Sequence, residues 1–250
     1  MAFDIDATIK QGWDDYFART PRFDVFHQEA RYRKILRTNV ISAIVAFSLA
    51  VIVLVAVLVY GRVFTIVIGS VLALMLAIYG LMSLRKRLSL LRQSAGRPGL
   101  AFGVSTEGIH TPVLPTIPWS DVLAVFVMDE SRHVDYALSL KGMKGLAARY
   151  ARANGRGARH INIVLPEGAA LRQQVRPPEY AKVVELWSHF ENPKFGVLSY
   201  TLDPTVDIEQ VRQISMATAV LAERNGVTTT LSEGAADFVE HMGTISKIFD

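Results

Sequence analysis

The sequence predicts a membrane α-helical hairpin followed by a cytoplasmic α+β domain, and three observations lead to this fold class. Residues 40–84 contain a single charged side chain, that of Arg62. From residue 100 to about residue 165, short apolar segments are separated by Gly, Pro and Asp, as in a series of strands. Amphipathic helical patterns occupy most of the chain after residue 177.

The apolar stretch is long enough for two membrane spans. A hydrocarbon core ~30 Å thick takes about 20 helical residues. Residues 40–60 and 63–84 provide 21 and 22 uncharged residues. Gly61 can end a helix, whereas Tyr60 and Arg62 suit the interface between lipid and water. We therefore expect two helices joined by a turn at these three residues.

Composition also predicts how the hairpin, taken as residues 38–86, is packed and used. Neither half has a polar face, which disfavours the alternative of a helical pair buried in a soluble core. Gly69, Ser70 and Gly80 are small enough to allow close contact between the two helices. No Asp, Glu, Lys or His lies inside either half, so a transporter or channel is disfavoured.

The basic residues predict the orientation of the hairpin. Residues 31–97 carry ten Lys or Arg and no acid, whereas the remainder carries 17 basic and 23 acidic residues. By the positive-inside rule, we expect a multi-pass protein of the inner or plasma membrane with both termini in the cytoplasm. Anionic lipid headgroups explain this charge better than nucleic acid does. The expected anchors at the membrane flanks are Arg31, Arg33, Lys34, Arg37, Arg62, Arg85, Lys86 and Arg87.

Residues 1–37 are predicted to form a cytoplasmic amphipathic segment. Ile9, Trp13 and Phe17 recur every four residues, which indicates a short helix with one apolar face. Asp14 and Asp15 disfavour an anionic lipid surface, so we expect this face to pack on the domain rather than on the membrane.

The domain proper is placed at residues 98–192. We expect strands in the segments LAFGVS, GIHTPV, VLAVFVMD, YALSLK and HINIVL. The segment PPEYAKVVELWSHFE follows and is predicted to be a helix, because its apolar residues form one stripe. That stripe consists of Tyr180, Val183, Val184, Trp187 and Phe190. Antiparallel strands closed by this helix predict a small barrel or sandwich.

One segment of the predicted domain carries a family resemblance. STEGIHTPVLPTIPWSDVLAV resembles the strand pair of the bacterial pleckstrin-homology-like (PH-like) domains, through Gly108, Ile109, Ile117, Pro118, Trp119 and Asp121. The resemblance extends over roughly residues 31–191, and many members of that family place the domain directly after a transmembrane hairpin. It implies a binding or scaffolding role rather than a reaction. Trp119 itself is expected to be a core aromatic residue.

A basic segment lies between the fourth and fifth predicted strands. In pleckstrin-homology domains a basic loop grips inositol phosphates, so the resemblance implies a contact with anionic lipid or a partner here. A solvated, glycine-loosened insertion without a ligand is the alternative. The candidate contact residues are Lys141, Lys144, Arg149, Arg152, Arg156 and Arg159.

Residues 196–250 are predicted to be a helical extension of this domain. The first helix is expected to be capped by Asp203, opened by Pro204 and closed at residues 224–226. Its apolar face is predicted to be Ile208, Val211, Ile214 and Leu221, and a last helix over residues 232–249 offers Phe238, Met242, Ile245 and Phe249. These faces could cover the barrel, cover each other or bind a partner chain.

No catalytic motif emerges from the sequence. The chain has no cysteine, its six histidines are dispersed, and it lacks the HExxH, GxSxG and Walker patterns. We therefore predict no catalytic residue, cofactor, metal, small-molecule substrate or nucleic acid. The predicted function is a non-catalytic scaffold or accessory subunit whose partners are the lipid bilayer and other membrane-complex subunits or further copies of itself. The alternatives are an anionic-lipid sensor acting through residues 141–159 and, third, an enzyme acting on lipid or envelope substrates.

Overall fold

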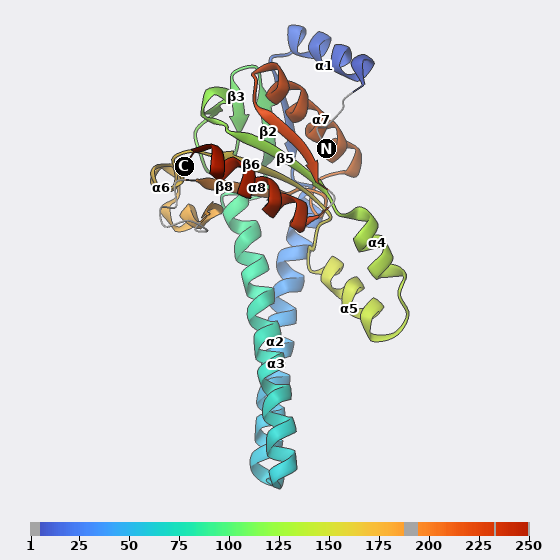
Figure 1. The fold of residues 1–250 in the computed structure, drawn as a ribbon. Helices are drawn as coiled ribbons and strands as arrows, with labels where there is room; N and C mark the ends of the chain where they lie inside the picture. Colours follow the sequence, from blue (N-terminus) through green and yellow to red (C-terminus); the bar gives the residue numbers. More distant parts are fainter. Residues whose placement is uncertain (1–5, 188–194, 233, 250) are drawn as a thin grey trace.

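The computed structural model describes residues 6–187, 195–232 and 234–249 (Figure 1). Two long helices form a stalk, and the remaining elements form a domain of helices and sheets at one end of it. The described chain begins and ends on this domain, so both of its ends lie at the same end of the stalk. The fold class is confirmed as a helical hairpin joined to an α+β domain.

The stalk consists of α2 (Glu29–Tyr60) and α3 (Val63–Gln93). The turn between them lies at Gly61 and Arg62, two of the three residues where it was predicted, while Tyr60 is the last residue of α2. At 1.5 Å per residue each helix is about 45–50 Å long. Each helix therefore extends beyond its apolar half, residues 40–60 or 63–84. The helices continue through the basic flanks because no Pro or Gly interrupts residues 29–40 or 84–93, and they reach the domain without a linker.

Small side chains line the contact between the two stalk helices. On α2, Ala43, Ala46 and Ala50 are buried, with the three- and four-residue spacing of a helix seam. On α3, a Cβ added to Gly80 would lie 2.9 Å from Cζ of Phe47, and one added to Gly69 would collide with the Val57 side chain. The predicted close contact is therefore confirmed at Gly69 and Gly80. It is wrong for Ser70, which is exposed.

Gly80→Leu is expected to destabilise the hairpin by about 1–3 kcal/mol, the range for overpacking a close contact. The added side chain would overlap the Phe47 ring and push the two helices apart. The thermal unfolding midpoint of the purified protein in detergent measures the effect. Ser70→Leu is the matched control on the exposed side, and Phe47→Ala in the Gly80→Leu background should recover part of the loss. Equal midpoints for the two leucine variants would contradict the packing described above.

Two sheets make up the domain. The first has the order β1-β2-β3-β4 and is antiparallel, with β1 Arg22–Phe26, β2 Leu100–Ser105, β3 Gly108–His110 and β4 Ile117–Pro118. The second has the order β7-β8-β6-β5-β9, with β5 Ala124–Asp129, β6 Arg159–Leu165, β7 Val184–Leu186, β8 Gly196–Thr201 and β9 Thr228–Ser232. Its pairs are antiparallel except β5 with β9.

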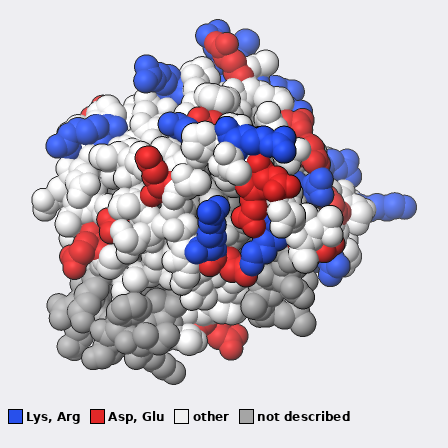
Figure 2. All heavy atoms as spheres, turned by 90° about the horizontal axis from the view of Figure 1, so that it is seen from above, with Lys and Arg blue, Asp and Glu red and all other residues white. Residues whose placement is uncertain are grey.

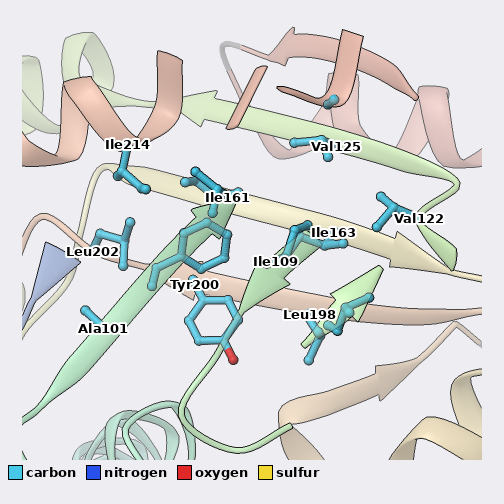
Figure 3. Packing of buried hydrophobic residues seen from close by; sticks show 14 of the residues in the cluster. Ala101, Ile109, Val122, Val125, Ile161, Ile163, Leu198, Tyr200, Leu202 and Ile214 are labelled. Carbon is cyan, nitrogen blue, oxygen red and sulfur yellow. The ribbon is translucent and has the colours of Figure 1, made fainter. Parts of the chain in front are cut away.

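The main core lies between the two sheets (Figure 3). Alternate residues of β6, such as Ile161 and Ile163, face this core, whereas Val164 faces the other side of the sheet. Phe102 and Tyr200 join the two sheets through a ring contact of 5.3 Å between centroids. The outer side of the second sheet is covered by α8 (Ala235–Phe249).

Helices at both ends of the sequence complete the domain. α7 (Ile208–Arg224) buries Val211, Ile214 and Leu221 as predicted, but Ile208 is 48% exposed. α1 (Ala7–Arg19) is present as predicted, with Phe17 in the core. On α8, Phe238 and Met242 pack as predicted, whereas the side chains at 245 and 249 lie outside the described part.

The expected strand YALSLK is wrong, and so is the loop that was expected to follow it. The chain instead forms two helices, α4 (Ser131–Ser139) and α5 (Gly142–Ala153), which return beside the stalk (Figure 1). YALSLK contains Ala, Leu and Lys and no β-branched residue, so its composition favours a helix over a strand. The alternation of apolar residues was too short to distinguish the two.

The helix predicted over PPEYAKVVELWSHFE is also wrong where the chain is described. A 3₁₀ turn, η2 (Pro178–Val183), leads into β7, while residues 188–191 lie outside the described part. Val184, which is β-branched and begins β7, favours the extended backbone, and β7 pairs with β8. The helix that closes the core is α7 instead. A short helix, α6 (Gly168–Gln174), packs against η2 and β7.

Residues 196–250 belong to the same domain as residues 98–192. β8 lies between β6 and β7 in the second sheet and contributes Leu198 and Tyr200 to the main core. The expected separation of a helical extension from the domain is therefore wrong, because this region supplies the interior strand β8 and the parallel edge strand β9. The two helices predicted within it are present as α7 and α8. Trp119, in the 3₁₀ turn η1 (Trp119–Asp121), is 4% exposed and donates to the Ser105 carbonyl at 2.9 Å, which confirms its core role.

Candidate functional site

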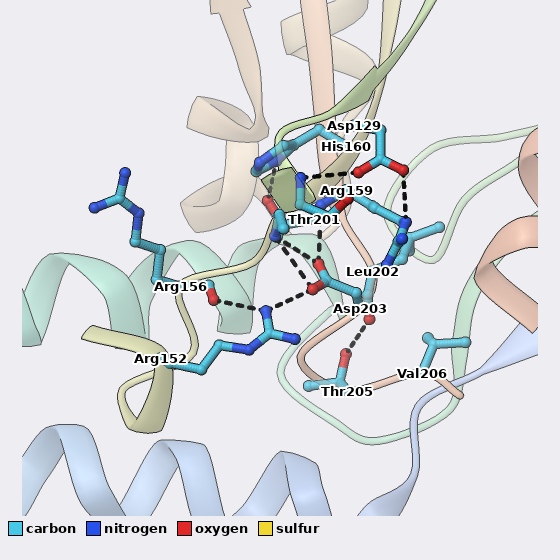
Figure 4. A network of polar contacts seen from close by, with 12 residues as sticks. Asp129, Arg152, Arg156, Arg159, His160, Thr201, Leu202, Asp203, Thr205 and Val206 are labelled. Atoms are coloured by element: carbon cyan, nitrogen blue, oxygen red, sulfur yellow. Dashed lines mark hydrogen bonds and ion pairs between the residues drawn. The ribbon is translucent and has the colours of Figure 1, made fainter. Parts of the chain in front are cut away.

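A buried carboxylate holds the base of the domain together where it meets the stalk. Asp203, whose side chain is fully buried, follows β8 and accepts hydrogen bonds from the backbone N–H groups of Ala158 and Arg159 at 3.0 and 3.1 Å. It also forms an ion pair of 2.6 Å with Arg152 (Figure 4). Asp203 therefore does not cap α7 as predicted, because Asp207 accepts from the Glu209 N–H and takes that position.

Two of the six predicted basic contact residues are used inside the domain. Arg152 is paired with Asp203, and Nε of Arg159 lies 3.0 Å from a carboxylate oxygen of Asp129. Burial alone would raise the pKa of Asp129, but hydrogen bonds from Ser131 and the Arg159 guanidinium hold that pKa below its usual value. The other four, for which no ion pair is recorded among the described residues, are exposed: Lys141, Lys144, Arg149 and Arg156.

Polar side chains connect the stalk to α5 and the second sheet. Nδ2 of Asn39 donates to the Asn154 carbonyl at 3.1 Å, and Oγ of Ser42 donates to Oδ1 of Asn154 at 3.2 Å. On α3, Nε2 of Gln93 donates to the Ser199 carbonyl at 2.9 Å. These residues could not be predicted from the sequence, because isolated Asn and Ser near an apolar helix form no pattern. They fix the direction in which the domain leaves the stalk.

His27 occupies the short connection between β1 and α2. Its side chain is buried, Nδ1 lies 2.8 Å from Oγ1 of Thr205, and Nε2 has no hydrogen-bond partner among the described atoms. Burial lowers the pKa of His27 from 6.5 to about 4, because the charged imidazolium would lose its hydration. The ring is therefore neutral in the folded protein at pH 7.

This environment predicts a loss of stability in mild acid. Because the folded pKa of about 4 lies below the unfolded value of 6.5, the unfolded chain binds a proton first. The contribution of His27 is therefore fully present above pH 6.5 and is lost as the pH falls towards 4. The size of the pKa shift limits the stability that His27 can lose in acid to about 3 kcal/mol.

Thermal unfolding at pH 7.5 and pH 5 measures this effect, with His27→Gln as the comparison. The variant should lose less stability between these two pH values than the wild type. The stability of the variant should still depend on pH, but less strongly, because burial also lowers the pKa of His160. Identical losses for the variant and the wild type would contradict the assignment to His27.

Two hollows open beside the junction of the stalk and the domain. A polar cleft of about 270 Å³ lies between α3, the connection from α5 to β6, and the end of β8. An apolar groove of about 1150 Å³ lies between the two stalk helices and α5. Lys86, Asn154 and Arg156 line both hollows, so they mark the place where the two meet. Neither hollow could be predicted from the sequence, because both depend on α5 returning to the stalk.

The predicted flank anchors lie at both ends of the stalk. Arg62 is at the turn, and the other seven lie near the domain, on the first turns of α2 and towards the end of α3. They are not equivalent: Arg33 pairs with Glu29, Nη1 of Arg31 lies 3.4 Å from the Val206 carbonyl, and Lys86 is half-buried in the two hollows. Their contact with lipid stays a prediction.

Two helices, Glu29–Tyr60 and Thr65–Gln93, are long and apolar enough to cross a membrane.

Across residues 6–187, 195–232 and 234–249, no group of three or more His, Cys, Asp or Glu is placed to hold a metal ion. No family model, curated protein or solved structure matches the chain.

Proposed function

We propose that the stalk crosses a lipid bilayer twice and holds the α+β domain at the cytoplasmic surface. The exposed apolar surface of the stalk carries this proposal. Only 28% and 11% of the most apolar parts of α2 and α3 are buried. Large side chains such as Ile52 and Leu74 are 62% and 61% exposed. An apolar surface of this length is unfavourable in water and favourable in hydrocarbon.

The distribution of charge supports the cytoplasmic orientation. Seven of the eight flank anchors lie where the stalk meets the domain, and one lies at the opposite turn. Under the positive-inside rule the domain and both ends of the described chain are then cytoplasmic. The membrane is the inner or plasma membrane.

The role of the domain within this proposal is that of a scaffold or accessory subunit of a membrane complex. The hydrogen bonds from Asn39, Ser42 and Gln93 hold the domain in a fixed position on the stalk, as a presenting module requires. On the face opposite the stalk, acidic and basic side chains are interspersed over the described part (Figure 2). Such a mixed surface suits a protein partner better than a nucleic acid. The resemblance to PH-like domains agrees with this role.

Purification of the full-length chain in a mild detergent, followed by native mass spectrometry, tests the scaffold role. The expected result is a complex with a second protein or with further copies of the chain. Recovery of an isolated monomer alone, under conditions that preserve other membrane complexes, would contradict it.

A second candidate function, contact with anionic lipid, is favoured by the pair α4 and α5. These helices expose Tyr136, Met143 and Leu146 to 68%, 81% and 56%, beside the exposed cations Lys144 and Arg149. Exposed apolar and basic residues together are typical of a helix that lies in the membrane interface. The pair also lies next to the stalk (Figure 1).

An environment-sensitive fluorophore attached at Met143→Cys tests this contact in vesicles that contain the reconstituted protein. The labelling is specific because the chain has no other cysteine. Emission should shift to the blue when phosphatidylglycerol is added to phosphatidylcholine vesicles, and Lys144→Gln with Arg149→Gln should reduce the shift. The same fluorophore at Ser120→Cys, on an exposed turn, is the control. Equal responses at both positions would contradict the contact.

A further inference from the structure

The apolar groove differs from the rest of the stalk surface because it has a third wall. Along most of their length, α2 and α3 present only their own outer faces. Beside Leu49 and Leu76, however, α5 adds Leu146, Ala147 and Tyr150 to make a channel that runs towards the domain. Its volume of about 1150 Å³ slightly exceeds the roughly 300–1,000 Å³ of typical ligand sites. A long apolar chain can therefore lie between the stalk and α5.

The domain end of this groove is cationic. Lys86 and Arg156 line both the groove and the polar cleft, and Arg149 lines the groove. No ion pair is recorded for Lys86 or Arg156 among the described residues, in contrast to Arg152 and Arg159. The one carboxylate among the residues that line the polar cleft is Glu130, and it does not line the groove. An anionic group at the meeting point of the two hollows would face the cations Lys86 and Arg156.

A polar hydroxyl group is also left without a partner beside the groove. Tyr79 lines the groove and its ring contacts that of Tyr150 at 5.3 Å between centroids, while its hydroxyl is buried and has no hydrogen-bond partner among the described atoms. Buried hydroxyl groups in proteins nearly always have a partner. The ester carbonyl of a lipid in the groove would supply the hydrogen-bond acceptor that the Tyr79 hydroxyl group lacks.

The depth of the cations matches that of a lipid headgroup. Lys86 follows Arg62 by 24 residues, which corresponds to about 36 Å along a helix. A hydrocarbon core is about 30 Å thick, so Lys86 lies just beyond it when the turn lies at the opposite surface. Leu49 and Leu76 are then inside the hydrocarbon, and the groove joins the two regions.

We propose that this groove holds one glycerophospholipid molecule from the leaflet on the domain side. Its phosphate lies between Lys86 and Arg156, and an acyl chain lies along the apolar wall formed with α5. The inference rests on the proposed insertion of the stalk, and it specifies a single bound lipid rather than a general contact of α4 and α5 with the surface. The bound lipid would fill the space between the stalk and α5.

Native mass spectrometry of the full-length chain in detergent tests this site with added phosphatidylglycerol. The wild type should retain one lipid molecule. Lys86→Gln with Arg156→Gln should weaken binding by roughly tenfold for each cation removed, since each loses a charge-assisted hydrogen bond. The matched control is Lys34→Gln with Arg85→Gln, which removes the same charge from exposed positions outside both hollows and should bind as the wild type does.

Two further comparisons separate the site from general affinity for lipid. Ala147→Trp should block the groove without a change of charge and should also abolish retention. A diacylglycerol with the same acyl chains, which lacks the phosphate, should bind at least roughly tenfold more weakly than phosphatidylglycerol. Equal binding of the two lipids, or binding by the Lys86 and Arg156 variant equal to that of the control, would overturn the proposal.

Extraction of the same membranes with alkaline carbonate distinguishes this failure from failure of the proposed function. If the wild type resists extraction but the variants bind lipid unchanged, the lipid site alone is wrong. If the wild type is extracted as a peripheral protein, the insertion of the stalk is wrong and the site falls with it.

Discussion

Asp203→Ala is expected to lower the free energy of unfolding by about 3 kcal/mol, because a buried donor that loses its acceptor costs about 1–3 kcal/mol and Asp203 accepts from two backbone N–H groups. The carboxylate has no exposed surface and accepts hydrogen bonds from the N–H groups of Ala158 and Arg159 as well as from Arg152. Alanine would leave the backbone N–H groups of Ala158 and Arg159 without this acceptor, whereas the Arg152 side chain is 39% exposed and can be hydrated. The end of β8 and the connection from α5 to β6 would then separate.

Asp207→Ala is the matched control for this prediction. Asp207 is the residue that caps α7, and loss of an N-cap costs about 1 kcal/mol. Chemical denaturation in detergent, followed by tryptophan fluorescence, compares the two variants. If both variants lost the same stability, Asp203 would be acting as an ordinary cap and the network in Figure 4 would not hold the junction together.

Lysine at the middle of both stalk helices is expected to prevent insertion. Ile52→Lys and Leu74→Lys each place a charge near the centre of the apolar stretch, at positions that are 62% and 61% exposed. A lysine at the centre of a membrane helix costs about 2.5–3.5 kcal/mol. In water the same exposed substitutions would change stability by only about 0.5 kcal/mol. The double variant should therefore be lost from the membrane fraction or degraded.

Val59→Lys is the control for this second prediction. Val59 is 67% exposed but lies beside the turn, where a lysine can reach the aqueous interface. The membrane fraction of each variant is measured by carbonate extraction and immunoblotting. An Ile52→Lys and Leu74→Lys double variant that inserts as well as Val59→Lys would show that these helices do not lie in hydrocarbon.

The hairpin and several domain elements could be predicted from local patterns. The length and composition of residues 40–84 predicted both helices and the turn, because apolar length is a property of the chain alone. The segment LAFGVS coincides with β2, and residues 224–226 end α7 as expected. These signals depend on neighbouring residues in the sequence. Tertiary structure changed none of them.

The elements that were missed depend on contacts between distant parts of the chain. β1 is only five residues long and is fixed by pairing with β2, about 80 residues later. β8 becomes central because β6 and β7 pair on either side of it. The helix in the PH-like pattern was assigned to the segment before residue 192, whereas the core selects α7.

The candidate site was only partly predictable for the same reason. The basic segment was visible as a run of charge, but its division into paired and exposed residues depends on Asp129 and Asp203. Asp203 resembled a helix cap because Pro204 follows it, while its real partners come from the α5 to β6 connection. The groove exists only because α5 folds back beside the stalk.

Cysteine labelling in intact membranes tests the central claim most directly, because the native chain contains no cysteine. Single variants Ile52→Cys, Leu74→Cys and Ser120→Cys are treated with a water-soluble maleimide in membrane vesicles whose cytoplasmic face is outward. We predict that Ser120→Cys reacts, whereas Ile52→Cys and Leu74→Cys react only after the membrane is dissolved in denaturant. Reaction of the two stalk variants as fast as Ser120→Cys in intact vesicles would contradict the account.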